Sequence, residues 1–251
     1  ELGAKVIAMG VQPNGFNINE GVGSTDMAQL SQLVVSQNAD LGIAYDGDGD
    51  RVLFVDHTGD LVDGDELIYV ISSHRLATGR SDAGVVGTLM SNLGLEKALR
   101  EAGLQFVRAQ VGDRYVKELM EQHGWSVGGE ASGHIICSDV TTTGDGIVAS
   151  LQVLAALKGA AVGLAALRQG MKKYPQTMIN VAVSGKIVLS EHPELDDVVR
   201  GVEDELGERG RVLLRASGTE PLVRVMIEGE DAEQVAALCA GLARQVEKIL
   251  G

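Results

Sequence analysis

Apolar residues follow two spacings along this chain, and each spacing predicts one type of element. Short apolar runs bounded by Gly, Asn, Asp or Pro are typical of strands, and apolar residues every three or four positions are typical of helices. The expected elements are a strand over 4–10, a helix over 25–39, a strand over 40–46, a hairpin over 51–65, a helix over 65–79, a strand over 83–91, a helix over 92–103, strand–turn–helix over 104–124, strand–loop–strand over 125–139, helices over 144–159, 160–171 and 195–207, strands over 211–217 and 223–230, and a helix over 232–250.

The order of these elements predicts an α/β protein with layered mixed α/β domains, followed by a small α+β C-terminal domain. We place one boundary near Val62, where the hairpin ends, and a second near Tyr174, where the composition shifts. The expected segments are 1–62, 63–174 and 175–251.

Charge and cysteine content narrow the class of protein. The 251 residues carry a formal net charge of −14, with 45% hydrophobic and only 3% aromatic residues. The chain has no basic stripe of the kind that binds nucleic acids, and it has no run of 18 apolar residues that could span a membrane. Cys137 and Cys239 lie far apart and have no metal-ligand spacing, so we expect free thiols in the reducing cytoplasm. Because the chain as a whole is strongly acidic, an anionic ligand would need a local source of positive charge.

The stretch DGDGDR places three aspartates, Asp46, Asp48 and Asp50, at alternate positions after a predicted strand. Converging carboxylates suit Mg²⁺, which prefers oxygen ligands in octahedral geometry. A calcium EF-hand loop needs Gly at its sixth position and Glu at its twelfth, where this chain has Arg51 and His57. The flanking elements are also strands, which excludes an EF-hand and leaves a Mg²⁺ site or a solvated acidic turn.

Two further loops carry candidate ligands. In GGEASGH, an extended backbone would point Glu130, Ser132 and His134 to one side, to hold a polyol or move a proton; a polar hairpin turn is the alternative. In RASGTEPLVR, an arginine fork, hydroxyls and backbone amides could bind a phosphate, although a plain loop with a surface arginine has the same pattern. The candidate phosphate ligands are Arg215, Ser217, Gly218, Thr219 and Arg224.

Other polar groups have simpler explanations. Asp113 precedes a predicted helix and could cap it, and Asp145 lies at a predicted helix entry. Ser73 and His74 are adjacent on a helix and so do not face each other.

The three loops, in this order, resemble the metal, sugar and phosphate loops of the α-D-phosphohexomutase family. Residues 10–19 and 141–154, with the Gly-Thr-Glu-Pro of the phosphate loop, are similar to the bacterial amino-sugar branch. The resemblance extends over the whole chain, with a departure at Ala131, where related enzymes often carry a larger or polar residue. It implies the later part of domain 2 and all of domains 3 and 4 of a four-domain enzyme.

The family resemblance also implies a mechanism. A phosphoserine exchanges phosphate with the sugar through a bisphosphate, which interconverts the 6-phosphate and 1-phosphate of a hexosamine for cell-wall precursors. One Mg²⁺ ion would be held by the three aspartates, with Arg51 beside the phosphoserine. Glu130 and Ser132 would bind sugar hydroxyls, His134 would assist proton movement, and the residues of the RASGTEPLVR loop would hold the phosphate that is not transferred.

The family's catalytic serine, in a Thr-Ala-Ser-His-Asn-like loop, has no counterpart in this sequence. We therefore expect a fragment that has no turnover alone. The alternatives are a branch that acts on glucose or mannose phosphates, or a sugar-phosphate-binding module without catalysis. In each case the expected partner is a small sugar phosphate and not a nucleic acid or a membrane.

Overall fold

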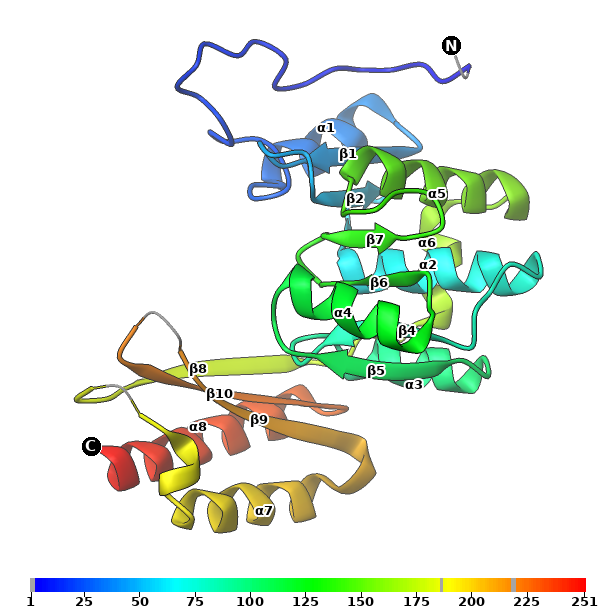
Figure 1. Cartoon of the computed structure of the whole chain (residues 1–251). Coiled ribbons are helices and arrows are strands. Elements are labelled where there is room, and N and C mark those ends of the chain that lie inside the picture. The colour runs from blue at the N-terminus through cyan, green and yellow to red at the C-terminus, as the bar shows by residue number, and fades with distance from the viewer. Residues whose placement is uncertain (1–2, 186, 218–219) are drawn as a thin grey trace. The chain divides into compact units, whose positions relative to one another are not determined.

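The computed structural model describes residues 3–185, 187–217 and 220–251, and its helices and strands are labelled in Figure 1. The chain divides into two compact units, which are described separately. Unit 1 comprises Glu1–Ser91 and Leu95–Lys172, and unit 2 comprises Asn92–Gly94 and Lys173–Gly251.

Unit 1 begins with a small antiparallel sheet in the order β1-β2-β3. Helix α1 (Ala28–Gln37) packs on it through Leu30 and Val34, whose side chains lie so close to Gly42 that a Cβ there would collide with them. The strands are β1 (Leu41–Tyr45), β2 (Val52–Asp56) and β3 (Leu61–Val62).

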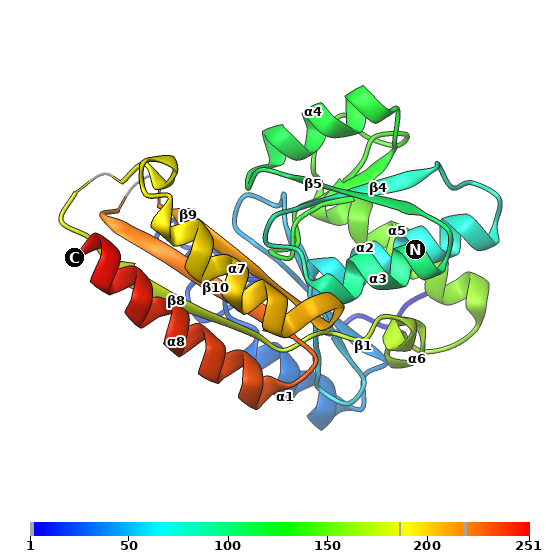
Figure 2. The same cartoon turned by 90° about the horizontal axis from the view of Figure 1, so that it is seen from below.

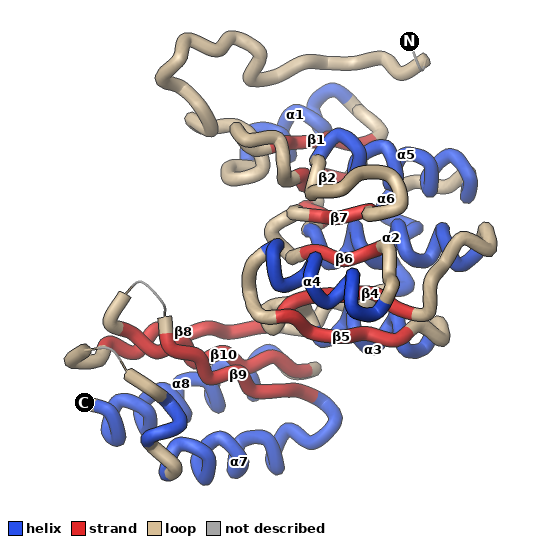
Figure 3. The backbone as a smooth tube through the Cα atoms, viewed as in Figure 1, coloured by secondary structure: helices blue, strands red, loops and turns tan. Residues whose placement is uncertain are grey.

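The strand predicted over residues 4–10 is wrong. Residues 3–27 form no helix or strand, and Figure 3 shows this stretch as a long loop before α1. Most of its large apolar side chains are exposed, with Val6 at 79% and Phe16 at 94% of their full accessibility, whereas Met9 packs partly against the cluster of α1 and the first sheet. Apolar, β-branched composition favours a strand only where a partner strand and a buried face exist, and this stretch has neither in the described structure.

A second sheet of unit 1 has the order β5-β4-β6-β7, in which β4 pairs in parallel with β5 and β6, and β7 pairs antiparallel with β6. Helix α4 covers one face through Val86 and Ile136, and helices α2, α3 and α5 cover the other through Val85 and Ile135. The strands are β4 (Gly84–Thr88), β5 (Gln105–Ala109), β6 (Val127–Gly129) and β7 (Ile135–Cys137). The helices are α2 (Gly64–Ala77), α3 (Leu93–Glu101), α4 (Asp113–His123) and α5 (Gly146–Ala160).

The helix predicted over 160–171 is shorter than expected. It consists of α6 (Leu164–Leu167) and the 3₁₀ turn η1 (Arg168–Gly170). Ala161, in the left-handed conformation, ends α5 and separates the two helices. Within the described residues, no single helix meets the length and hydropathy that a membrane span needs, and only Gly146–Ala160 with Leu164–Gly170, bent by 88°, meet them together.

Both sheets of unit 1 contribute to one hydrophobic core. Val52 and Phe54 of β2 pack in the same cluster as Leu67 of α2 and Ile135 of β7. The free Cys137 also lies in this core, where burial raises the pKa of its thiol to about 11. This shared core fixes the loops at the ends of β1, β2, β6 and β7 relative to one another.

Unit 2 is a three-stranded antiparallel sheet in the order β8-β10-β9, with two long helices on one face, as Figure 2 shows. Val223, Val225 and Ile227 point into the core formed with the helices. Strand β8 was not predicted from the sequence. The elements are β8 (Gln176–Ala182), η2 (Leu189–Glu191), α7 (Glu194–Leu206), η3 (Gly207–Arg209), β9 (Gly210–Ala216), β10 (Leu222–Gly229) and α8 (Ala232–Leu250). The predicted α/β class with a small α+β C-terminal part is confirmed, and Cys239, in this core, is the second free buried thiol.

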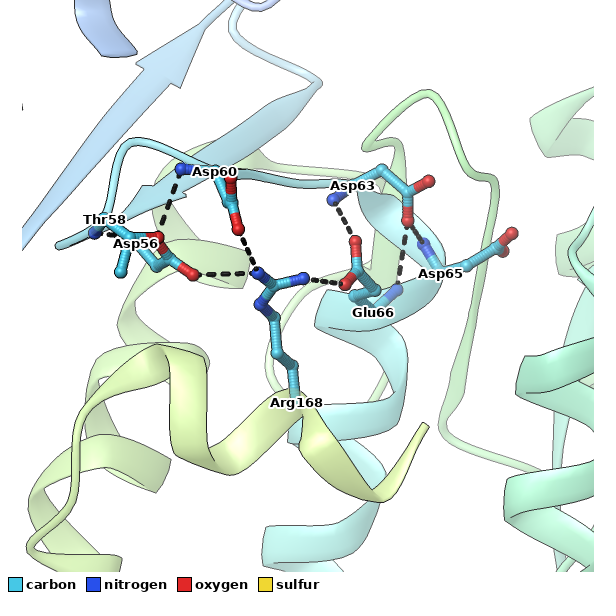
Figure 4. A network of polar contacts seen from close by, with 7 residues as sticks. All are labelled: Asp56, Thr58, Asp60, Asp63, Asp65, Glu66 and Arg168. Carbon is cyan, nitrogen blue, oxygen red and sulfur yellow. Dashed lines mark hydrogen bonds and ion pairs between the residues drawn. The ribbon is translucent and has the colours of Figure 1, made fainter. Parts of the chain in front are cut away.

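A buried ionic cluster joins β2, α2 and η1 in unit 1 (Figure 4). Arg168 donates to Asp56 Oδ2 at 2.9 Å and to Glu66 Oε1 at 2.8 Å, and it also reaches the exposed Asp60. Burial alone would raise the pKa of Asp56, but hydrogen bonds from Thr58 and Arg168 outweigh it and hold the pKa below 3.8. Removing the arginine would take the cation away from the fully buried carboxylate of Asp56.

We predict that Arg168→Met lowers the free energy of unfolding of unit 1 by about 3–5 kcal/mol, because breaking a buried ion pair leaves uncompensated charge. Trp125, the single tryptophan, is buried in unit 1 and reports its urea unfolding by fluorescence. The matched control is Arg100→Met, since Arg100 is 63% exposed in its pair with Glu96 and should change stability by at most about 1 kcal/mol. Equal effects of the two substitutions would contradict the prediction.

The depressed pKa of Asp56 predicts a pH dependence. Its carboxylate stabilises the fold fully above the ordinary value of 3.8, and this contribution is lost as the pH falls through the lower folded value. The stability difference between the unmodified chain and Asp56→Asn should therefore be constant above about pH 5 and shrink in more acidic solution. A difference that stays constant throughout the acid range would show that Asp56 does not titrate in this way.

Candidate functional site

The loop from Asp46 to Arg51 connects β1 to β2 and folds back on its own first residue. Asp46 Oδ1 accepts hydrogen bonds from the backbone N–H of Gly49 at 3.0 Å and of Arg51 at 3.2 Å. Gly49 has a φ of +73°, a left-handed conformation that favours glycine. The alternation of Asp and Gly therefore forms a compact turn in place of a continued strand.

This turn brings together Asp46, Asp48 and Asp50, which offer one carboxylate oxygen each within 4.8 Å of one another. Asp46 and Asp50 are half-buried and Asp48 is exposed. Asp50 Oδ1 is a buried oxygen with no hydrogen-bond donor among the described residues. A buried anionic oxygen without a donor is costly, and a cation would satisfy it. The donor set is all oxygen and therefore fits Mg²⁺.

Arg51 lies beside the three aspartates. Its side chain is 45% exposed, and Nε lies 4.0 Å from Asp46 Oδ2, beyond hydrogen-bond distance. Its backbone forms a β-bridge with His134, and the next residue, Val52, donates to Gly133 O at 3.1 Å. The aspartate loop and the GGEASGH loop are thus joined by backbone pairing.

Of the two conformations predicted for residues 130–134, the structure has the hairpin turn and not the extended segment. These residues form the turn of the β6–β7 hairpin, in which Gly133 N–H donates to Glu130 O and Glu130 N–H to His134 O, both at 3.0 Å. Gly133 has a φ of +93°, and a Cβ there would lie 2.3 Å from Val52 O. Because the backbone turns, alternate side chains do not share one direction.

The three polar side chains of this turn separate accordingly. Glu130 Oε1 accepts from the backbone N–H of Gly112 at 3.0 Å, Ser132 is exposed, and His134 is buried with Nδ1 3.0 Å from Asp50 Oδ2. The structure therefore brings His134 to the aspartates and directs Glu130 toward the start of α4.

Two polar residues at helix starts behave differently. Asp113 does not cap α4 as predicted: Gly112 is the N-cap residue without a side-chain bond, and the Asp113 carboxylate lies 4.0 Å from His134 Nε2. Asp145 does cap α5, accepting from the backbone N–H of Ile147 and Val148.

The start of α5 also contacts the aspartate loop, and this contact was not predicted from the sequence. Gly146 N–H donates to Gly49 O at 2.9 Å, and a Cβ on Gly146 would lie 2.8 Å from Arg51 O. The glycines around Asp145 were the available signal, since they permit this close approach.

Unit 2 holds the candidate phosphate ligands. Arg215 of β9 and Arg224 of β10 are directly opposite each other in the sheet, and Asn180 of β8 is opposite Arg224 on the other side. Burial, then the charge of Arg224, lowers the pKa of Arg215. Nε of each arginine is buried without a hydrogen-bond partner among the described residues. Like charges directly opposite each other are destabilising, so this pair is suited to an anion.

The loop after Arg215 is described in part. Ser217 Oγ accepts from the backbone N–H of Glu220 at 3.2 Å, and Arg224 lies 3.7 Å from the Glu220 carboxylate. Gly218 and Thr219 lie outside the described residues. Asn180 was not predicted from the sequence, because its position beside the arginines follows only from strand register.

Comparisons with known families identify two regions of the chain. The model described as phosphoglucomutase/phosphomannomutase, alpha/beta/alpha domain III, matches residues 63–174, and that of the phosphoglucomutase/phosphomannomutase C-terminal domain matches 178–245.

Similar proteins include phosphoglucosamine mutases from Aeromonas salmonicida (strain A449) and Methylococcus capsulatus (strain Bath). Each is 57% identical over 248 residues, which cover 98% and 99% of this chain, respectively. The matched region spans 56% of the length of each relative.

Solved structures show the same fold. The N-acetylphosphoglucosamine mutase of Aspergillus fumigatus, in complex with GlcNAc-6P and magnesium, superposes with a TM-score of 0.74 at 22% identity, covering 93% of this chain and 54% of that one. A further N-acetylglucosamine-phosphate mutase, in a product complex, gives a TM-score of 0.71 at 20% identity, covering 91% and 53%.

The opposed arginines of unit 2 generate a prediction. Arg215→Gln and Arg224→Gln should each weaken binding of inorganic phosphate about 10-fold or more, since a hydrogen bond to a charged group contributes about 1.5–3 kcal/mol. Without phosphate, either substitution should raise the thermal stability of unit 2 by relieving repulsion. Isothermal titration and thermal unfolding measure the two effects.

The control is Arg200→Gln, because Arg200 lies on α7 with 66% of its side chain exposed. It should change neither quantity appreciably. If all three variants bind phosphate as tightly as the unmodified chain, the arginine pair is not the anion site.

Proposed function

Because the chain belongs to the phosphoglucomutase/phosphomannomutase family, we propose that the whole protein is a phosphoglucosamine mutase, which interconverts glucosamine 6-phosphate and glucosamine 1-phosphate. The observation that carries this proposal is the 57% identity to phosphoglucosamine mutases over nearly the whole chain. Since the chain spans 56% of their length, activity and substrate are proposed for the whole protein.

In this proposal Asp46, Asp48 and Asp50 hold one Mg²⁺ ion, consistent with the donor-free oxygen of Asp50. When bound, the ion would neutralise negative charge on a phosphate during phosphoryl transfer. Arg51, with its guanidinium exposed beside Asp46, would pair with an oxygen of the same phosphate.

The hairpin turn would bind the sugar. Ser132 is exposed at its tip and can donate to or accept from a hydroxyl. Glu130 is held by the Gly112 N–H through one carboxylate oxygen, and its other oxygen would accept from a second hydroxyl. A carboxylate fixed in this way accepts sugar hydroxyls with little loss of side-chain entropy.

The phosphate that is not transferred would lie on unit 2. Arg215 and Arg224 would supply charge and Ser217 a hydroxyl, with Gly218 and Thr219 as proposed ligands on the sequence pattern. In a chain with a net charge of −14, this pair is a local positive site for an anionic sugar phosphate.

We further propose that residues 1–62 belong to domain 2, that residues 63–174 form domain 3 and that residues 175–251 form domain 4. The match of the domain III model to residues 63–174 supports the bounds of domain 3. A cytoplasmic protein with a small hexosamine phosphate as its partner accords with two buried free thiols and this ligand set.

A substrate assay tests the function. The full-length protein should turn over glucosamine 6-phosphate with a kcat/KM well above that for mannose or glucose phosphates. The 251-residue chain alone should show no turnover, because none of its serines lies in the family's catalytic-serine sequence. A preference for the neutral sugars would assign the protein to another branch of the family, and turnover by this chain alone would contradict the assignment of the nucleophile.

A further inference from the structure

We propose that His134 is a positioning residue of the metal site: its Nδ1–H fixes the carboxylate of Asp50 so that Oδ1 faces the cation. This inference rests on the proposed function of the aspartate loop as a Mg²⁺ site. It assigns to His134 an action through Asp50, which differs from the proton transfer implied by family resemblance.

The contact between the two side chains defines the tautomer. Nδ1 of His134 lies 3.0 Å from Asp50 Oδ2. An ionised carboxylate only accepts hydrogen bonds, so Nδ1 carries the proton and donates it. The other carboxylate oxygen, Oδ1, is buried and has no donor among the described residues. One oxygen of Asp50 is thus held by the imidazole, and the other remains for a cation.

The imidazole is itself fixed on several sides. The backbone of His134 bridges to Arg51, and its carbonyl accepts from Glu130 N–H at 3.0 Å. Gly144, just before the cap of α5, packs against the ring so closely that a Cβ there would lie 2.1 Å from Nε2. His134 is only 6% exposed, so its ring is enclosed by protein with Nδ1 facing Asp50.

The far nitrogen of the ring has a different environment. Nε2 is buried and has no hydrogen-bond partner among the described residues, and the Asp113 carboxylate is 4.0 Å away. The hydrogen bond to Asp50 is therefore the ring's only polar contact within hydrogen-bond distance in the described part of the chain. Donors that orient a metal ligand in this way commonly contribute 10-fold to 100-fold to metal affinity.

Two substitutions separate hydrogen bonding from packing. The amide nitrogen of Asn lies two bonds from Cβ, as Nδ1 does, whereas that of Gln lies three bonds away, as Nε2 does. His134→Asn can therefore donate to Asp50 Oδ2 but fills less space, and His134→Gln fills more space but places its donor near Gly144. If His134 acts by hydrogen bonding, His134→Asn should retain more metal affinity than His134→Gln. If it acts by packing, His134→Gln should retain more.

The experiment measures Mn²⁺ binding to the 251-residue chain by electron paramagnetic resonance, with Mg²⁺ as competitor. His134→Gln should weaken Mn²⁺ affinity about 10-fold to 100-fold, and His134→Asn should stay close to the unmodified chain. Asp48→Asn removes a proposed ligand and should weaken binding strongly, whereas Asp40→Asn, at an exposed aspartate outside the loop, should not. The fluorescence of Trp125 verifies that each variant is folded.

The outcomes separate this inference from the proposed metal site. If Asp48→Asn weakens Mn²⁺ binding but His134→Gln does not, the positioning role is wrong and the metal site stands. The same conclusion follows if His134→Gln and His134→Asn bind Mn²⁺ with equal affinity, whether or not that affinity is reduced. If Asp48→Asn binds like Asp40→Asn, the metal site is wrong and the inference falls with it.

Discussion

Three aspartates with carboxylate oxygens within 4.8 Å of one another repel. The backbone of their own loop, His134 and the start of α5 keep them close together. Two unit charges 4 Å apart at an effective dielectric constant of about 20 repel by about 4 kcal/mol. Backbone donors offset part of this cost at Asp46, and the imidazole of His134 offsets part at Asp50. The remaining negative charge lies at Asp48, which is exposed, and at Oδ1 of Asp50, which is buried without a donor among the described residues. The loop is thus a preorganised acidic site that a divalent cation would complete.

The rigidity of this site comes from the core shared by the two sheets of unit 1. β2 leaves the aspartate loop, packs Val52 and Phe54 into the same core as β7, and ends at Asp56 in the buried cluster with Arg168. The hairpin turn meets β2 through Gly133, where no larger residue fits. Because both loops are fixed to the same strand, the proposed metal ligands and the proposed sugar ligands would be positioned together.

Features that depend on neighbouring residues could be predicted from the sequence, and features that depend on strand register or on tertiary contacts could not. The spacing of Asp46, Asp48 and Asp50 was sufficient to predict a cluster of carboxylates, because a turn after a strand brings near neighbours together. The spacing of Glu130, Ser132 and His134 was misleading, since alternation implies a common face only on an extended backbone. The contact of Gly146 with Gly49 was missed, because it joins segments far apart in the sequence and the glycines permit a close approach without specifying its partner. The strand expected over 4–10 failed for a related reason, since a strand requires a partner that local composition does not specify.

We propose that the aspartate loop binds a divalent cation through one oxygen of each aspartate. A crystal structure of the chain soaked with Mn²⁺, with an anomalous difference map, would show whether it does. We expect one strong peak within coordination distance of Asp46, Asp48 and the Oδ1 atom of Asp50, with His134 Nδ1 still hydrogen-bonded to Oδ2. If the map has no peak at the loop, or if other side chains coordinate the peak, the loop is not the cation site.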